Sequence, residues 1–273
     1  MTWVGYQGVP GAYSEEALLA YFGSRARPQP FSDFEAVFRA VVKGKVAAGI
    51  VPIENSLAGS IHQNYDLLLK YAVWIRGEHK LRVRHNFMVV PGVRLANVRR
   101  VYSHPQALAQ CAIFLKALKR VELVPHFDTA GAAAYVAAEG LVDAAAVASA
   151  RAADNYGLKV LKRGIEDNVQ NYTRFLVIGK SDTRPKGQRI KTSVVFALRN
   201  IPGAMHKSLG IFALRDIDLL KIESRPLAGS PWQYLFYLDL AGAVDHEPVA
   251  RALDHLKEIS TYCKVLGSYP VAE

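Results

Sequence analysis

Cysteine and long apolar runs are both scarce in this sequence. Cys111 and Cys263 are the two cysteines among 273 residues, which is too few for a cysteine-rich metal site or a disulfide scaffold. No apolar run approaches the ~18 residues that a membrane span requires. The first residues show neither the basic n-region nor the apolar h-region of a signal peptide. We therefore expect a cytoplasmic protein that has no membrane partner.

Several motifs of nucleotide, metal and hydrolase sites are also missing. Neither G-x-G-x-x-G nor G-x-x-x-x-G-K-[ST] occurs, which leaves a dinucleotide site or a P-loop without support. The motifs H-E-x-x-H and G-x-S-x-G are absent as well. The eight histidines are scattered, and none pairs with a carboxylate at a spacing typical of metal ligands. The sequence therefore predicts neither a metal nor a cofactor.

Positive charge is in excess, and all of the excess lies in the first two-thirds of the chain. The 34 Lys and Arg residues outnumber the 24 Asp and Glu residues, so the formal net charge is +10. Residues 1–189 hold 25 basic and 15 acidic residues, whereas residues 190–273 hold nine of each. We expect the first part to bind an anion. The densest basic stretch, 76–84, lacks the interleaved aromatic residues typical of nucleic-acid binding, so we expect no nucleic-acid partner.

A polar, basic segment at 181–190 that contains Pro and Gly predicts a linker between domains at 1–180 and 191–273. Before it, apolar runs typical of buried strands lie at 3–7, 46–53, 86–90, 121–127 and 144–148. Helical patterns lie between them at 34–42, 105–118 and 129–139, which favours a parallel α/β sheet. After it, strands at 191–198, 219–224, 233–240 and 264–269 alternate with helices at 203–215 and 247–263. That order, βαββαβ, is ferredoxin-like.

Polar side chains follow several strands of the first domain. They occur at 7–14, 54–60, 103–106 and 128–131, where ligands of open α/β sheets usually bind. Taken singly, each group is an ordinary helix cap. Four groups in one basic domain instead favour a shared carboxylate-binding cleft. A fifth candidate is Thr173-Arg174, where Arg174 is either solvated or, beside the Thr173 hydroxyl, able to hold a carboxylate.

Six segments in order resemble the prephenate dehydratase family with a C-terminal ACT regulatory domain. They are Gly8-Val9-Pro10-Gly11-Ala12-Tyr13-Ser14, Pro52-Ile53-Glu54-Asn55-Ser56, Ser103-His104-Pro105-Gln106-Ala107-Leu108, Asp128-Thr129-Ala130, Asn171-Tyr172-Thr173-Arg174-Phe175 and Glu223-Ser224-Arg225-Pro226. The resemblance implies an α/β catalytic region like a type II periplasmic binding protein. Its two lobes would be 1–80 with 165–180, and 81–164. The ferredoxin-like part would be the ACT domain.

The resemblance also implies an activity, the loss of CO2 and hydroxide from prephenate to give phenylpyruvate. It assigns catalytic roles to four residues, namely Thr173, Asn55, Ser56 and Gln106. It assigns substrate binding to Gly11, Ala12, Tyr13, Glu54, Ser103, Thr129, Arg174 and Phe175. We expect Thr173 to donate a hydrogen bond to the leaving hydroxyl, and Arg174 to pair with the pyruvyl carboxylate. A fully paired ring carboxylate would resist becoming CO2, so that group should lie in a drier place.

Feedback inhibition by phenylalanine is a further implication of the resemblance. The effector site would combine two segments, Gly203, Ala204 and Met205 with Glu223, Ser224, Arg225 and Pro226, at an interface between subunits. A homo-oligomer follows, either a dimer or a tetramer built as a dimer of dimers. Two alternatives stay open at this point. One is an arogenate dehydratase, which acts on the transaminated analogue, and the other is a non-catalytic cytoplasmic amino-acid sensor.

Overall fold

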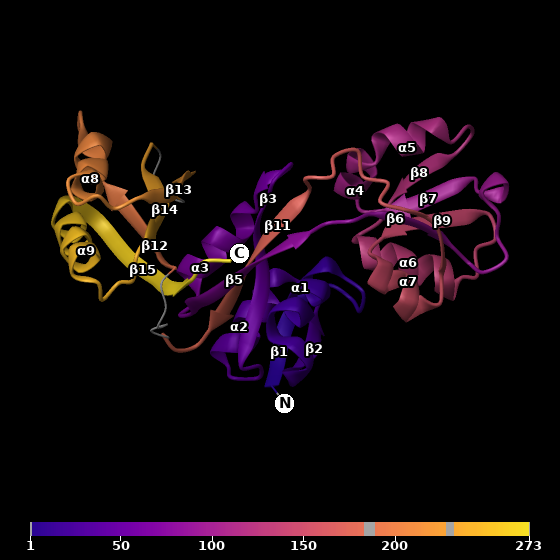
Figure 1. Ribbon diagram of the computed structural model, residues 1–273, viewed down its shortest axis with the longest axis horizontal. Coiled ribbons are helices and arrows are strands. Elements are labelled where there is room, and N and C mark those ends of the chain that lie inside the picture. Colours follow the sequence, from indigo (N-terminus) through magenta and orange to yellow (C-terminus); the bar gives the residue numbers. More distant parts are fainter. Residues whose placement is uncertain (1, 183–188, 228–231, 273) are drawn as a thin grey trace. The chain divides into compact units, whose positions relative to one another are not determined.

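Three β-sheets organise the computed structural model, which describes residues 2–182, 189–227 and 232–272 (Figure 1). These residues divide into two units. Unit 1 comprises residues 2–71 and His79–Leu176, and unit 2 comprises Ala72–Glu78 and the described residues from Val177 onward. Most of the predicted linker at 181–190 lies outside the described residues, so the division into two domains stays a prediction.

The first sheet has the strand order β2-β1-β3-β11-β5, with β4 paired to β3. Its strands are β1 (Thr2–Gln7), β2 (Ala26–Phe31), β3 (Ala48–Asn55), β4 (Gly59–Ser60), β5 (Trp74–Arg82) and β11 (Tyr172–Gly179). The accompanying helices are α1 (Tyr13–Phe22), the short 3-10 turn Gly23–Arg25, α2 (Phe34–Val42) and α3 (His62–Lys70). Strand β2 was not predicted, since Pro28 and Pro30 usually disfavour strands. It lies at the sheet edge, where a missing N–H is tolerated.

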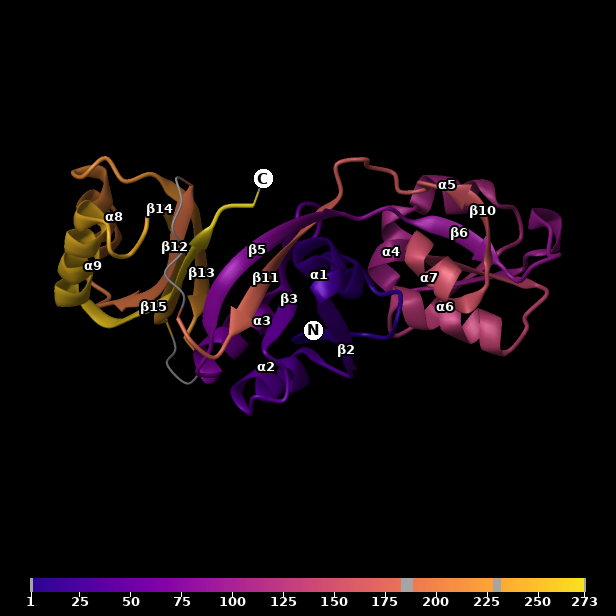
Figure 2. The same cartoon turned by 60° about the horizontal axis from the view of Figure 1, so that its bottom comes forward.

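The second sheet has the order β10-β6-β9-β7-β8. Its strands are β6 (Asn86–Val89), β7 (Arg100–Ser103), β8 (Glu122–Pro125), β9 (Ala144–Ala148) and β10 (Lys159–Arg163). The expected parallel arrangement holds for β7, β8 and β9, but β6 runs antiparallel to both of its neighbours. In both views the helices α4 (Pro105–Gln110) and α5 (Ala112–Ala117) cover one face, and α6 (Thr129–Ala138) and α7 (Ala150–Tyr156) cover the other (Figures 1 and 2). The short 3-10 turn Leu95–Asn97 precedes β7.

The helix predicted at 105–118 is interrupted. It divides at Cys111, whose backbone leaves helical geometry and whose side chain is fully buried in the core of this lobe. Asp167 stabilises the interruption from both sides. Its N–H donates to the carbonyl of Gln110 at 2.8 Å, and its carboxylate accepts the N–H of Ile113 at 3.0 Å. These bonds satisfy main-chain groups that a continuous helix would have paired.

The third sheet, in unit 2, is antiparallel with the order β13-β14-β12-β15. Its elements are β12 (Ile190–Leu198), α8 (Ala204–Ala213), β13 (Leu219–Pro226), β14 (Tyr234–Ala241), α9 (Glu247–Ile259) and β15 (Ser260–Pro270). This confirms the ferredoxin-like βαββαβ order, and with the two-lobed α/β part it confirms the expected fold class. The helix predicted at 247–263 ends earlier, because Ser260 to Cys263 pair with β12 instead.

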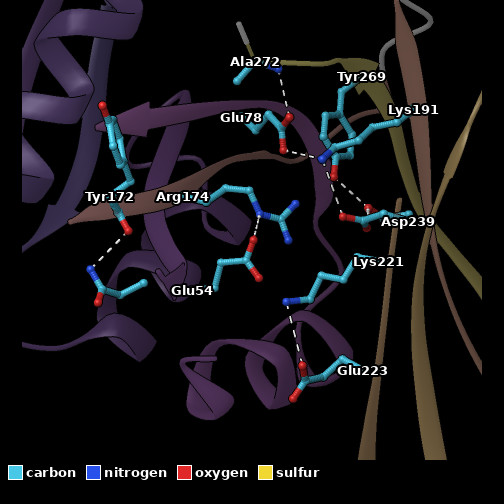
Figure 3. A network of polar contacts seen from close by, with 12 residues as sticks. Glu54, Glu78, Tyr172, Arg174, Lys191, Lys221, Glu223, Asp239, Tyr269 and Ala272 are labelled. Atoms are coloured by element: carbon cyan, nitrogen blue, oxygen red, sulfur yellow. Dashed lines mark hydrogen bonds and ion pairs between the residues drawn. The ribbon is translucent and has the colours of Figure 1, made fainter. Parts of the chain in front are cut away.

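A buried cluster of charges joins the segment Ala72–Glu78 to this sheet within unit 2 (Figure 3). The ammonium of Lys191 lies 2.6 Å from Glu78 Oε2 and 3.5 Å from Asp239 Oδ2. The other oxygen of Glu78 accepts the N–H of Ala272 at 2.9 Å. The side chains of Glu78 and Lys191 are 0% and 7% exposed, so this ion pair is shielded from solvent.

Candidate active site

A cavity of about 370 Å³ lies within unit 1, a volume typical of small-molecule sites. It is bordered by the polar segments that follow β1, β3, β7 and β8, together with the start of β11. Seven residues named from the sequence line it, namely Ala12, Tyr13, Asn55, Gln106, Thr129, Thr173 and Phe175. The structure therefore brings together parts of all five candidate segments. Five other predicted residues do not line the cavity, namely Gly11, Glu54, Ser56, Ser103 and Arg174.

Gly11 holds its loop close to helix α7 instead. Its φ is +92°, and a Cβ added there would lie 2.7 Å from the Cα of Ala152. Its N–H donates to the carboxylate of Glu15 at 2.6 Å, and its carbonyl accepts the hydroxyl of Ser149 at 2.7 Å. Glycine therefore supplies both the conformation and the close approach that place Ala12 and Tyr13 at the cavity.

Ser56 and Ser103 have structural contacts. The Ser103 hydroxyl is buried and donates to the carbonyl of Val147 at 2.6 Å. The Ser56 hydroxyl donates to the carbonyl of Gln170 at 2.8 Å and accepts the N–H of Tyr172 at 2.9 Å. The two serines thus join chain segments and leave the ligand contacts to other residues.

Arg174 lies on the other face of β11 from Thr173 and Phe175. Successive side chains of a strand point to opposite faces, so Thr173 and Arg174 cannot both enter one cavity. The Nε of Arg174 lies 2.6 Å from the Glu54 carboxylate, and Figure 3 shows this ion pair. Arg174 therefore does not line this cavity, and its expected contact with a substrate carboxylate stays a prediction. The strand period alone was sufficient to predict its absence from the lining.

The cavity is also less positive than the sequence suggested. None of the residues that line it, within the part of the chain that the structure describes, is a lysine or an arginine. It contains the carboxylate of Asp128 and the imidazoles of His85 and His104. Burial lowers the pKa of both histidines, so both rings are neutral near pH 7. The excess of basic residues thus does not surround the ligand directly.

The orientation of Asn55 determines how Thr173 can act. The N–H groups of Leu57 and Ala58 donate to Asn55 Oδ1 at 3.1 and 3.0 Å. The amide nitrogen of Asn55 must then face Thr173, and it donates to Thr173 Oγ1 at 3.0 Å. Because Oγ1 accepts this bond, the hydroxyl hydrogen of Thr173 is left to donate to a ligand in the cavity.

Sequence reasoning missed three residues that continue this arrangement, namely His85, Gln110 and Asn171. Asn55 also donates to Asn171 Oδ1 at 2.8 Å, and Asn171 Nδ2 donates to Gln110 Oε1 at 2.9 Å. A signal for Gln110 was present, because it lies four residues after Gln106 and so on the same helical face. Asn171 belongs to one of the six resembling segments but was given no role, and nothing in the sequence indicated His85; both meet Gln110 only through the tertiary fold.

Asp128 begins helix α6, where its Oδ1 accepts the N–H of Gly131. Its Oδ2 is buried and has no hydrogen-bond partner among the described residues. The negative charge of Asp128 opposes the burial effect on the pKa of His104. No group of three His, Cys, Asp or Glu residues arranged to hold a metal ion occurs in the described ranges. Among the same residues, no helix has the length and apolar character needed to cross a membrane.

A second cavity, of about 240 Å³, lies in unit 2 beside the turn that precedes α8. Gly203, Ala204 and Met205 line it, as do Trp232 and Tyr234. Gly203 has φ +77° at the N-cap of α8, which favours glycine there. The four other residues predicted for the effector site, Glu223, Ser224, Arg225 and Pro226, lie on β13 and do not line this cavity. Within a single chain, the two segments predicted for the effector site therefore do not line the same cavity.

The fold and the site define a two-lobed α/β protein with a cavity lined mainly by neutral hydrogen-bonding groups, and with a ferredoxin-like unit. A family model described as prephenate dehydratase matches residues 4–183. The chain belongs to the prephenate dehydratase family and is a carbon–oxygen lyase, which excludes the non-catalytic sensor considered above.

Similar proteins cover nearly the whole chain. Arogenate dehydratase/prephenate dehydratase 2, chloroplastic, of Arabidopsis thaliana is 48% identical, over 98% of this chain and 72% of the relative. The structure of prephenate dehydratase from Arthrobacter aurescens in complex with L-Phe has a TM-score of 0.91 and 30% identity, covering 98% and 90% of the two chains. A structure described as GqqA, a novel type of quorum quenching acylase, has a TM-score of 0.91 and 36% identity, covering 98% of both chains.

The expected cytoplasmic location is contradicted by these comparisons. The Arabidopsis relative is described as chloroplastic, which points to a plastid instead. The expectation depended on the absence of a signal-peptide pattern in the first residues, and that pattern reports only on secretion.

Proposed function

We propose that this chain catalyses the decarboxylating dehydration of prephenate to phenylpyruvate. The observation that carries the proposal is the hydroxyl of Thr173, which accepts a hydrogen bond from Asn55 and so has its own hydrogen available in the cavity. Ala12, Tyr13, Gln106, Thr129 and Phe175 supply the rest of the binding surface. The other predicted residues contribute indirectly. Gly11, Ser56 and Ser103 hydrogen-bond to neighbouring chain segments, and Glu54 pairs with Arg174.

The reaction needs one proton. The bond between the ring and its carboxylate breaks, its electron pair enters the ring, and the ring hydroxyl leaves, taking up a proton to form water. A threonine hydroxyl is too weak an acid to be ionised near pH 7, so Thr173 acts by a hydrogen bond that strengthens as charge develops on the leaving oxygen. The net proton comes from solvent.

The absence of Lys and Arg from the described cavity lining suits a carboxylate that must become CO2. A guanidinium would stabilise the ionised carboxylate in the ground state and so oppose its loss. Neutral donors, such as the amide of Gln106, can hold the other carboxylate of the substrate with a weaker field. The ring carboxylate then lies beside apolar atoms, such as those of Phe175.

Arogenate is a second candidate substrate, favoured by Asp128. Arogenate carries an ammonium where prephenate carries a ketone, and the negative charge of Asp128, which lines the cavity, would attract that ammonium. The relatives support this too, since the Arabidopsis protein is described by both activities and arogenate dehydratase 2 of Petunia hybrida by the second.

We also propose that residues 191–273 form an ACT regulatory domain that binds phenylalanine. The cavity beside Gly203, Ala204 and Met205 would hold the effector, completed by Glu223–Pro226 of another subunit in a dimer or tetramer. Support comes from the size of that cavity and from the similar structure that was solved with L-Phe. By this proposal, residues 1–180 form the catalytic domain.

The test is turnover of prephenate and of arogenate by the same preparation, each with and without phenylalanine. Formation of phenylpyruvate or phenylalanine supports the dehydratase, and no turnover of either substrate contradicts it. A rate that phenylalanine does not change contradicts the regulatory part alone. Hydrolysis of an N-acyl amide is measured in parallel, because one similar structure is described as an acylase.

A further inference from the structure

His85 is a buried residue that lines the cavity, and it directly precedes strand β6. It is 2% exposed. Its Nδ1 lies 2.9 Å from the hydroxyl of Tyr13, and its Nε2 lies 2.9 Å from Gln110 Oε1. Its main-chain N–H donates to the carboxylate of Glu166 at 2.9 Å, which holds the residue in place independently of its ring.

The proton on the His85 ring can be assigned from main-chain groups more than 25 residues away in sequence. The N–H groups of Leu57 and Ala58 can only donate, so they determine which end of the Asn55 amide faces Asn171. Asn171 must then accept from Asn55 through Oδ1 and donate through Nδ2. The atom of Gln110 that receives this bond is its oxygen. His85 meets the same oxygen, so its Nε2 carries a hydrogen.

The Gln110 amide is therefore held with its oxygen turned away from the ligand. Both of its hydrogen bonds to the protein, from His85 and from Asn171, use Oε1. Gln110 lines the cavity, so its amide nitrogen is the end left to donate to a bound substrate. Without the bond from His85, one donor instead of two would oppose rotation of this amide by half a turn.

We propose that His85 is a positioning residue for the reaction, acting through Gln110. With its proton on Nε2, it fixes the Gln110 amide as a donor toward the substrate. Its other nitrogen, Nδ1, then accepts a hydrogen bond from the hydroxyl of Tyr13, the first residue of helix α1, and the carbonyl of Arg84, at 2.8 Å, competes for the same hydroxyl hydrogen. The expected effect on turnover rests on the proposed function, whereas the hydrogen bonds assigned to His85 do not depend on it.

Two substitutions separate the nitrogens of the ring. In His85→Gln the terminal amide can take the place of Nε2, and in His85→Asn it can take the place of Nδ1. We expect kcat/KM of His85→Asn to fall about tenfold to hundredfold, as misplaced contact groups do. His85→Gln should lose less, because a donor toward Gln110 remains. Equal losses in both variants, accompanied by equal falls in Tm, would indicate a merely structural role and overturn the proposal.

A double-mutant cycle tests the route through Gln110. If His85 acts through that amide, His85→Asn should cost little further activity in a Gln110→Ala background. Independent, additive losses overturn the proposal. His255→Asn is the matched control, because His255 is exposed on α9 and should leave activity unchanged.

The last measurement does not depend on turnover. Nitrogen-15 NMR of the histidine rings should show His85 as the neutral tautomer with its hydrogen on Nε2, and Gln110→Ala should shift that resonance. A ring protonated on Nδ1 alone overturns the proposal. If the wild type turns over neither prephenate nor arogenate while the NMR result holds, the proposed function fails and the hydrogen-bond assignment stands.

Discussion

Two buried polar clusters in this molecule differ in the kind of group they use. The cluster around Thr173 consists of amides, a hydroxyl and a neutral imidazole, whereas the cluster in unit 2 consists of the ions Glu78, Lys191 and Asp239. An amide has a donor end and an acceptor end, so a chain of amides carries direction. An ion pair carries charge but little direction. The amide cluster therefore orients the groups at the cavity, whereas the ionic cluster attaches the segment Ala72–Glu78 to the third sheet within unit 2.

The largest expected effect comes from breaking the ionic cluster. Lys191→Met would remove the ammonium that lies beside the buried carboxylates of Glu78 and Asp239, and we expect unit 2 to lose about 3–5 kcal/mol of unfolding free energy. Urea denaturation measures this. Lys257→Met is the control, because its pair with Asp254 is exposed and should be worth about 0–1 kcal/mol. A loss from Lys191→Met no larger than that of the control would contradict this account.

Removing the directed hydroxyl comes next. Thr173→Val keeps the shape of the side chain, and we expect kcat to fall about a hundredfold to a thousandfold, the usual cost of a lost transition-state donor. Steady-state kinetics measures kcat, and the melting temperature should change little. Thr173→Ser keeps a hydroxyl and should retain much more activity. Activity of Thr173→Val within a few-fold of wild type would remove the role proposed for this residue.

A smaller effect tests Asp128, the one carboxylate among the described residues that line the cavity. Asp128→Asn removes the charge but keeps an oxygen that can accept the N–H of Gly131, so helix α6 should still begin correctly. We expect kcat/KM for arogenate to fall about tenfold, since one charge–charge contact near a surface is worth about 1–4 kcal/mol. The value for prephenate should stay the same or rise. Equal losses on both substrates would show that Asp128 does not discriminate between them.

The smallest expected effect is the dependence of stability on pH. Burial lowers the pKa of His79, His85 and His104. Below pH ~6.5 the unfolded chain therefore binds more protons at these histidines than the native chain does. Stability from these groups is complete above pH ~6.5 and decreases as the pH falls through their lowered pKa values. Glu16, whose pKa burial raises, acts in the opposite direction. Replacing His85 by Gln should therefore reduce the slope of unfolding free energy against pH by up to about 1 kcal/mol per pH unit. An unchanged slope would contradict the lowered pKa of His85.

Much of the fold followed from local pattern. The βαββαβ order and helix α2, over Phe34–Val42, were predictable because hydrophobic periodicity and cap residues agree there, as with Asp33 before α2. The interruption at Cys111 was not predictable, because its cause is Asp167, more than 50 residues further along the chain. Strand β2 was missed because Pro28 and Pro30 usually disfavour strands. They are tolerated here because β2 is an edge strand that pairs with β1 on one side.

The candidate site was predicted in part for similar reasons. Asn55 stands at the carboxyl end of β3, where the fold class places ligands, whereas Thr173 stands at the start of β11; the structure puts both at the cavity. Arg174 was expected there because of its positive charge. That expectation did not consider that successive side chains of a strand point to opposite faces. The net charge of +10 suggested a cationic site, but a sum over residues says nothing about which side chains face a ligand.

The two N–H groups of Leu57 and Ala58 have a consequence for how this enzyme can vary. They set the direction of the amide chain from Asn55 to His85, yet they belong to the main chain, and the side chains at 57 and 58 take no part. Mutational drift at Leu57, whose side chain is exposed, should therefore be widely tolerated except for proline, whereas Ala58 also lines the cavity and should accept only small residues. A saturation library at position 57 would show proline alone depleted, as if a catalytic residue had been lost.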